Sequence, residues 1–148
     1  MQTVALTPAR VESLLSAIGK DRASDAPAPG KWSAREIVAH LADCELVFAF
    51  RMRQTLAAEN PTVQPFNQEK WAEVYGAYEA PSAMKTFSAL RYWNLAFLRS
   101  LKPEDLQRKM THPERGTMTL QTVVETIGGH DLNHIGQLER IASAAAAG

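Results

Sequence analysis

The chain has few of the features that mark secreted, membrane-bound or nucleic-acid-binding proteins. It contains one cysteine, Cys44, so no internal disulfide can form, which is typical of a reducing compartment. Its 16 basic and 16 acidic residues give a formal net charge of zero, which leaves no basic surplus for nucleic acid or an anionic membrane. No window approaches the roughly 20 apolar residues of a spanning helix, and the first ten residues lack the pattern of a signal peptide. We therefore expect a cytoplasmic protein whose partner is a small molecule or a second copy of itself.

Length and periodicity favour one helical domain. A chain of 148 residues, 45% of them hydrophobic, has the size of a single globular unit, so we expect one domain over residues 1–148. Its apolar residues recur at the helical period of 3.6, and no segment shows convincing alternation of the kind that strands show. Four such segments predict an all-α protein, a four-helix bundle.

The first two helices have recognisable starts. Thr7 is suited to cap a helix whose first residue is Pro8, and Gly19 is a plausible stop. Ser33 and Glu36 have the spacing of a capping box, which predicts the start of the second helix with little ambiguity.

The second half of the chain is expected to contain the other two helices. Residues 62–80 form a long connection with one short helix, of the kind that crosses from one end of a bundle to the other. Ser82 is expected to cap the third helix, which Pro103 prevents from continuing. Residues 102–118 are rich in turn formers, and the fourth helix begins near Thr119.

Three of the four histidines fall on the apolar stripes of these helices. His130 and His134 are four residues apart, so their side chains project from one helical face, and His40 shares the stripe of the second helix. A lone histidine on such a face is usually a hydrogen-bonded core residue. Three unpartnered imidazoles, however, would cost about 1 to 3 kcal/mol each. One ion bound by all three removes that cost and leaves positions for water or substrate; spacing alone leaves both interpretations open.

Two further residues with metal-binding side chains are given other roles. His112 lies in a polar loop, where a surface or loop-packing role is the more common one. Cys44 lies four residues after His40 and shares its helical face, yet a free cysteine is an ordinary small core residue, and we expect that role rather than a thiolate ligand.

Polar residues near the histidines are candidates for orienting them. Asp43, Asp131 and Gln137 each lie within three residues of a histidine; they are either solvated helix positions or partners that orient a metal-bound imidazole. Arginines on the helices, among them Arg91, are expected to be solvated, with a cationic rim around a site as the alternative. The aromatic residues are core by default, although Tyr75 on the long connection is placed where it can cover a pocket.

Two segments of the sequence resemble the DinB-like superfamily, which includes the YfiT-like metal-dependent hydrolases. They are KWSAREIVAHLADCE and HPERGTMTLQTVVETIGGHDLNHIGQLERI. The resemblance implies a four-helix bundle with up-down-down-up connections and a homodimer. It also implies a divalent ion, nickel or zinc, held by His40, His130 and His134, the same residues that the stripes select.

The resemblance does not select one activity. Our favoured interpretation is a thiol-dependent S-transferase acting on a small electrophile, with a low-molecular-weight thiol as cosubstrate whose pKa the ion lowers. The pair HDLNH supports this choice, because it lacks the internal glutamate base of HExxH zinc proteases. The alternative is a metal-dependent hydrolase in which a carboxylate such as Asp43 is the general base. A further alternative is a stress-related binding protein that holds a metal without catalysis.

Overall fold

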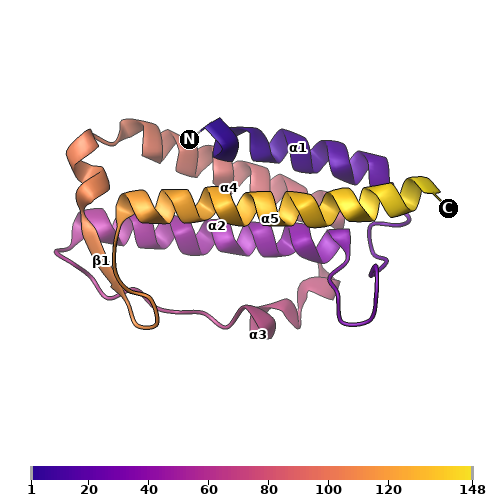
Figure 1. Ribbon diagram of the computed structural model, residues 1–148, viewed down its shortest axis with the longest axis horizontal. Coiled ribbons are helices and arrows are strands. Elements are labelled where there is room, and N and C mark those ends of the chain that lie inside the picture. Colours follow the sequence, from indigo (N-terminus) through magenta and orange to yellow (C-terminus); the bar gives the residue numbers. More distant parts are fainter. Residues whose placement is uncertain (1, 148) are drawn as a thin grey trace.

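Four long helices pack lengthwise into a bundle in the computed structural model, which describes residues 2–147 (Figure 1). The helices are α1 (Gln2–Ile18), α2 (Ala34–Ala57), α4 (Ala80–Ser100) and α5 (Leu120–Ala147). Helices α1 and α5 run in one direction and α2 and α4 in the other, with α2 packed on α4 and α1 packed on α5. This confirms the predicted four-helix bundle and its up-down-down-up order. Within the described residues, no helix combines the length and apolar character that crossing a bilayer requires.

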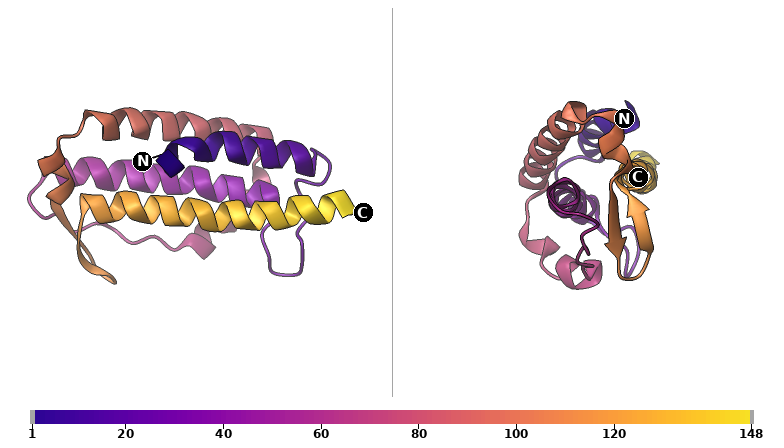
Figure 2. Two further views of the ribbon diagram at one scale, coloured as in Figure 1. Left: turned by 45° about the horizontal axis from the view of Figure 1, so that its top comes forward. Right: turned by 90° about the vertical axis from the view of Figure 1, so that its left-hand side faces the viewer.

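The parallel arrangement of α2 and α4 explains the long connection between them. Since both helices run the same way, the chain has to return the length of the bundle before α4 begins. It does so outside the bundle, through the short helix α3 (Gln68–Ala72) and the 3-10 helix η1 (Tyr75–Ala77), as Figures 1 and 2 show. The expected short helix in this segment is therefore present.

The segment expected to be merely turn-rich has regular structure. It contains the 3-10 helix η2 (Pro103–Gln107) and an antiparallel hairpin of β1 (Lys109–His112) and β2 (Gly116–Thr119). The expectation of no strand was wrong because each strand has only four residues, too few for alternation to stand out. The hairpin also pairs with the start of the long connection, where the Val63 N–H donates to the carbonyl of Thr111 at 2.9 Å.

The first helix begins earlier than its sequence suggests, and Pro8 lies inside it. A proline in a helix leaves the carbonyl four residues earlier without its usual N–H partner. Here that carbonyl belongs to Val4, and it accepts a hydrogen bond of 2.7 Å from Nη1 of Arg91 instead. The helix therefore continues through Pro8 because a residue of α4 replaces the missing donor.

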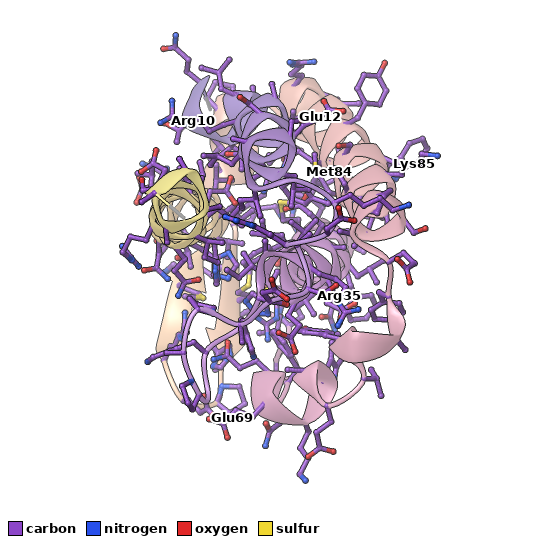
Figure 3. All side chains as sticks on the ribbon, turned by 90° about the vertical axis from the view of Figure 1, so that its right-hand side faces the viewer. Arg10, Glu12, Arg35, Glu69, Met84 and Lys85 are labelled. Atoms are coloured by element: carbon purple, nitrogen blue, oxygen red, sulfur yellow. The ribbon has the colours of Figure 1, made fainter. Side chains whose placement is uncertain are left out.

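The other helix starts are close to the predicted ones. The capping box of Ser33 and Glu36 is present at the start of α2. Helix α4 has Glu79 rather than Ser82 at its N-cap. In the end-on view of Figure 3, Met84 of this helix points into the bundle and Lys85 points away, as the helical period requires.

A buried ionic cluster connects the four long helices. Arg91 of α4, only 1% exposed, donates to both oxygens of Asp131 on α5 at 2.6 and 2.9 Å, and to Glu45 on α2 at 2.9 Å. The hydroxyl of Thr7 on α1 donates to Asp131 at 2.6 Å, and the Asn94 amide donates to Glu45 at 2.9 Å. Burial lowers the pKa of Arg91, but its bonds to the two carboxylates more than offset this and raise it overall. The expectation that Arg91 is solvated was therefore wrong.

Arg91→Met should destabilise the fold strongly. The substitution keeps much of the side-chain volume but leaves Asp131 and Glu45 buried without their cation, a change that costs about 3 to 5 kcal/mol. Urea unfolding followed by circular dichroism measures this loss. Lys85→Met on the exposed face of the same helix is the matched control and should change the free energy of unfolding by less than about 0.5 kcal/mol. Equal stability of the two variants would contradict the structural role of the cluster.

Candidate metal centre

The three histidines selected from the sequence meet where α2 and α5 contact each other. Nε2 of His40 lies 3.0 Å from Nε2 of His130, which lies 3.1 Å from Nε2 of His134. The ring centroids of the three imidazoles are 4.4 to 5.1 Å apart. His40 is 1% exposed and His134 is also buried. The spacing of four on α5 and the apolar stripe of α2 thus bring Nε2 of His40 and Nε2 of His134 each to within 3.1 Å of Nε2 of His130.

The outer nitrogens of two of these rings have partners that set their orientation. Nδ1 of His134 lies 2.7 Å from Oε1 of Gln137, one turn further along α5. Because that oxygen can only accept, Nδ1 carries the proton and Nε2 presents a lone pair. Nδ1 of His40 faces the hydroxyl of Tyr75 at a long 3.5 Å. Asp43 lies near enough to Tyr75 that its charge and a hydrogen bond act on the tyrosine.

The contacts among the Nε2 atoms fit a cation better than hydrogen bonds. Nε2 of His130 is within hydrogen-bond distance of two other Nε2 atoms, yet it carries at most one hydrogen and can donate to only one of them. Nε2 of His134 has no hydrogen to donate. If Nε2 of His130 carries a hydrogen, it can donate to only one of its two neighbours. If it carries none, two lone pairs face each other in its contact with His134. A cation accepts lone pairs from all three nitrogens, which is the preferred ligand chemistry of zinc and nickel among others.

Burial keeps the three imidazoles neutral. It lowers the pKa of His40 to about 3, with further lowering by His130 and His134. Burial also lowers the pKa of His130 to about 4, with a contribution from His134, and it lowers the pKa of His134, against which the bond to Gln137 acts. At neutral pH protons therefore compete weakly with a cation for these nitrogens.

Cys44 contacts the imidazole rings of the histidine cluster. Its Sγ atom is 3.5 Å from Nε2 of His40 and 3.7 Å from Nε2 of His130, and the side chain is 5% exposed. The possible ligand atoms of His40, Cys44 and His130 lie within 4.8 Å of one another. Burial, together with the charges of Asp43, Glu45 and Asp131, raises the pKa of the thiol to about 12. The predicted burial of Cys44 is correct, but its neighbours are imidazole rings.

The three candidates for orienting the histidines have different positions. Gln137 binds His134 directly. Asp43 is half-buried and acts through Tyr75, and burial raises the pKa of its carboxyl, against which the tyrosine bond acts. Asp131 does not reach His130, because Arg91 and Thr7 occupy its two oxygens. Adjacent residues on a helix point in different directions, so the sequence neighbour of a ligand is seldom its partner.

The fourth histidine is buried and separate from the other three. His112 ends strand β1 and is 5% exposed, so of the two roles expected for it, at the surface or in loop packing, it has the second. Its Nδ1 accepts the backbone N–H of Glu114 at 3.2 Å. Burial lowers its pKa, as do the nearby Arg51 and Arg115. The hairpin, which the sequence did not reveal, is what buries this residue.

Aromatic rings surround the histidine cluster. The Trp32 ring lies 4.8 Å from that of His40 and stacks on that of His134 at 6.3 Å, with an interplanar angle of 17°. Tyr75, fully buried, lies 5.9 Å from Trp32. Tyr75 of the long connection therefore lies against the histidine cluster, although it does not line the cavity described below.

A cavity of about 440 Å³ lies beside this aromatic wall. Trp32 and Gln137, which both contact the histidines, form part of its lining together with the apolar Ile37. Lys31 and Arg140 also line it, and no acidic residue does. Among the ion pairs formed within residues 2–147, none involves either of these two cations.

The fold and the converging histidines define a class of helical bundles with a histidine cluster between two helices. The family model of the DinB superfamily matches residues 3–138, and the chain belongs to this superfamily. The solved structure of YfiT from Bacillus subtilis matches with a TM-score of 0.89 over 97% of this chain and 83% of that one, at 21% identity. That protein is described as a probable metal-dependent hydrolase with an unusual four-helix bundle topology. At this identity the likeness establishes the fold alone.

Curated relatives share more of the sequence. A protein of Oceanobacillus iheyensis is 29% identical over 111 residues, which cover 74% of this chain and 64% of the relative. Proteins of Bacillus mycoides and Bacillus cereus are 30% and 31% identical over 108 residues, 71% of this chain and 61% of each relative. All three bear the name "Putative metal-dependent hydrolase". The chain thus spans less than two thirds of the length of these relatives.

The stability of the metal-free protein should fall with acid in a way that depends on His40. Its pKa is about 3 in the folded chain and 6.5 in the unfolded chain, so the unfolded state binds the proton first as the pH falls between these values. In excess chelator, lowering the pH from 6 to 4 should therefore reduce the free energy of unfolding of the wild type, relative to that of His40→Gln, by about 1.4 kcal/mol per pH unit. Urea unfolding of both proteins measures the difference, in which contributions from groups that do not interact with His40 cancel. A difference that does not change with pH would contradict the lowered pKa.

Proposed function

We propose that the chain is a metal-dependent hydrolase whose ion is held by His40, His130 and His134. The observation that carries the proposal is the meeting of three Nε2 atoms at 3.0 and 3.1 Å, on rings that burial keeps neutral. The names of the curated relatives agree with hydrolysis, and those of the three described above contain no reference to a thiol. Hydrolysis, initially the alternative, is therefore favoured over a thiol-dependent S-transferase. Zinc and nickel are the proposed ions, since imidazole suits both.

The ion would supply Lewis acidity and a lowered pKa for bound water. The protein's own contribution is orientation. Gln137 fixes the tautomer of His134 by accepting its Nδ1 proton, and such outer partners change metal affinity by about 10- to 100-fold. Tyr75 is placed to accept the Nδ1 proton of His40, while Trp32 packs against both rings and excludes water from them. The charge of Asp43 acts on Tyr75, which places this carboxylate beside the tyrosine that faces His40.

The adjoining cavity is the proposed substrate pocket, and its lining favours an anionic small molecule. Lys31 and Arg140 bring two positive charges to a space whose other walls are largely apolar, with no acidic residue among them. Pockets of this size, with apolar walls and a few placed polar groups, are typical of small-ligand sites. A small substrate with a carboxylate or phosphate group beside the bond to be cleaved would fit the pocket and pair with its two positive charges.

A homodimer remains a prediction, as does the absence of nucleic acid and membrane partners. Phe50 on α2 and Tyr92 and Trp93 on α4 are 63%, 71% and 65% exposed. A partner covering these side chains would remove large apolar surface from water.

Metal content and hydrolysis should depend on the same histidines. Purified wild-type protein loaded with zinc or nickel is expected to retain about one ion per chain after dialysis, whereas His130→Ala with His134→Ala retains none, as measured by atomic emission. The loaded wild type should hydrolyse members of an ester and amide panel without added thiol, and the double variant should not. His112→Ala is the matched control and keeps both properties. Equal metal content in all three proteins would remove the site, and turnover only with an added thiol would restore the transferase.

The anionic preference should depend on Lys31 and Arg140. For the best substrate of the panel, compared as matched carboxylate and amide forms, wild-type protein should prefer the carboxylate. Lys31→Met with Arg140→Met should raise KM for that form by about tenfold, the effect of losing about 1.4 kcal/mol of charged interaction. The KM of the neutral form should stay the same, as should metal content. A uniform rise in both KM values would indicate a loss of shape rather than of charge recognition.

A further inference from the structure

Cys44 has the contacts of a ligand atom rather than those of a packing residue. It follows His40 by one helical turn on α2, so both side chains project from one face toward α5. Free cysteines in cores usually pack among apolar side chains. The polar contacts of this sulfur are instead with Nε2 and Nδ1 of His40, at 3.5 and 3.9 Å, and with Nε2 of His130, at 3.7 Å.

The distances from the Cys44 sulfur to two Nε2 atoms match edges of a metal tetrahedron, within the group formed by His40, Cys44 and His130. A tetrahedral zinc ion has bonds of about 2.0 to 2.1 Å to nitrogen and about 2.3 Å to sulfur, which places nitrogen and sulfur about 3.6 Å apart. The Cys44 sulfur lies 3.5 and 3.7 Å from the two Nε2 atoms. The same geometry puts two nitrogens about 3.3 Å apart. The Nε2 atoms here are 3.0 and 3.1 Å apart, so the imidazole rings would have to separate only slightly.

The surroundings of the sulfur also favour a cation. Glu45, the next residue, and Asp131 are buried carboxylates that share the single guanidinium of Arg91. Their formal charges sum to one negative unit beside the cluster. A divalent ion would neutralise this negative charge together with the charge of a Cys44 thiolate. Neutral imidazoles would leave both charges uncompensated.

We propose that Cys44 is a fourth protein ligand, so that this chain offers three imidazole nitrogens and one thiolate. The inference rests on the proposed function, because it concerns the same ion. On binding, the S–H bond breaks, its proton passes to solvent and a sulfur–metal bond forms, with no change of oxidation state. A soft thiolate selects zinc, cobalt, nickel or copper over magnesium and manganese. Four protein ligands fill a tetrahedral shell, so hydrolysis here requires five-coordination, which catalytic zinc sites reach.

X-ray absorption of the zinc-loaded wild-type protein tests the proposal without any variant. One sulfur neighbour at about 2.3 Å, besides nitrogens at about 2.0 Å, is the expected result. Cys44 is the chain's only cysteine, so a thiolate signal has one source. A shell of nitrogen and oxygen alone would overturn the proposal.

Cobalt loading and a conservative variant provide the second measurement. The cobalt-loaded wild type should show a thiolate-to-cobalt charge-transfer band in the near ultraviolet, and Cys44→Ser should lack it. Cys44→Ser should also bind zinc at least tenfold more weakly, since loss of an outer partner alone costs about that much. Met52→Leu, a buried position further along α2, is the control for packing and keeps the band. Identical spectra and zinc affinities for wild type and Cys44→Ser would contradict ligation.

The two proposals fail in different ways. If His130→Ala binds zinc as tightly as the wild type, the three-histidine site itself is wrong. If His130→Ala loses zinc while the wild type shows no sulfur shell and no cobalt band, the histidine site stands and only the role of Cys44 is refuted.

Discussion

The buried guanidinium of Arg91 is the interaction on which the geometry of the bundle depends. It binds Asp131 on α5, Glu45 on α2 and the Val4 carbonyl on α1, so one side chain of α4 fixes the relative positions of the other three long helices. Asp131 is adjacent to His130 and Glu45 is adjacent to Cys44. A shift of either helix along its axis would therefore disturb both an interior ion pair and the histidine cluster. Buried ion pairs often stabilise a fold little compared with apolar packing, and this one is better understood as setting register.

The topology of the bundle and the position of the site follow from the same constraint. Because α2 and α4 run parallel, the chain between them has to return along the outside of the bundle (Figure 2). This return brings the Tyr75 hydroxyl to 3.5 Å from Nδ1 of His40. A bundle with only short connections would have no segment available to cover that ring. The aromatic wall around the histidines is thus partly a consequence of how the helices are connected, and the cavity beside it lies next to Trp32 at the start of α2.

Local signals predicted much of this structure, and distant partners were what they missed. The capping box at Ser33 and the spacing of His130 and His134 each involve residues three or four apart, so they are readable in the sequence. Arg91 looked like a surface residue because its partners are 40 and 46 positions away. For the same reason Pro8 looked like the start of α1: only the fold shows that Arg91 supplies the missing hydrogen bond. The convergence of His40 with the pair on α5 was expected from apolar stripes and resemblance together, since neither alone specifies which helices touch.

Burial has opposite effects on the nitrogens and the sulfur of the cluster. It lowers the pKa of His40 to about 3, so the imidazole is neutral and able to bind a cation at any physiological pH. It raises the pKa of the Cys44 thiol to about 12, so the sulfur remains protonated while the site holds no positive charge. If the proposed ion binds, the neutral imidazoles would hold it without losing a proton, and its charge would lower the cost of forming the Cys44 thiolate. A ligand that binds only the folded state adds to its stability as the logarithm of ligand concentration over Kd. The proposed ion would therefore also offset the cost of burying the polar side chains of His40, Cys44, His130 and His134.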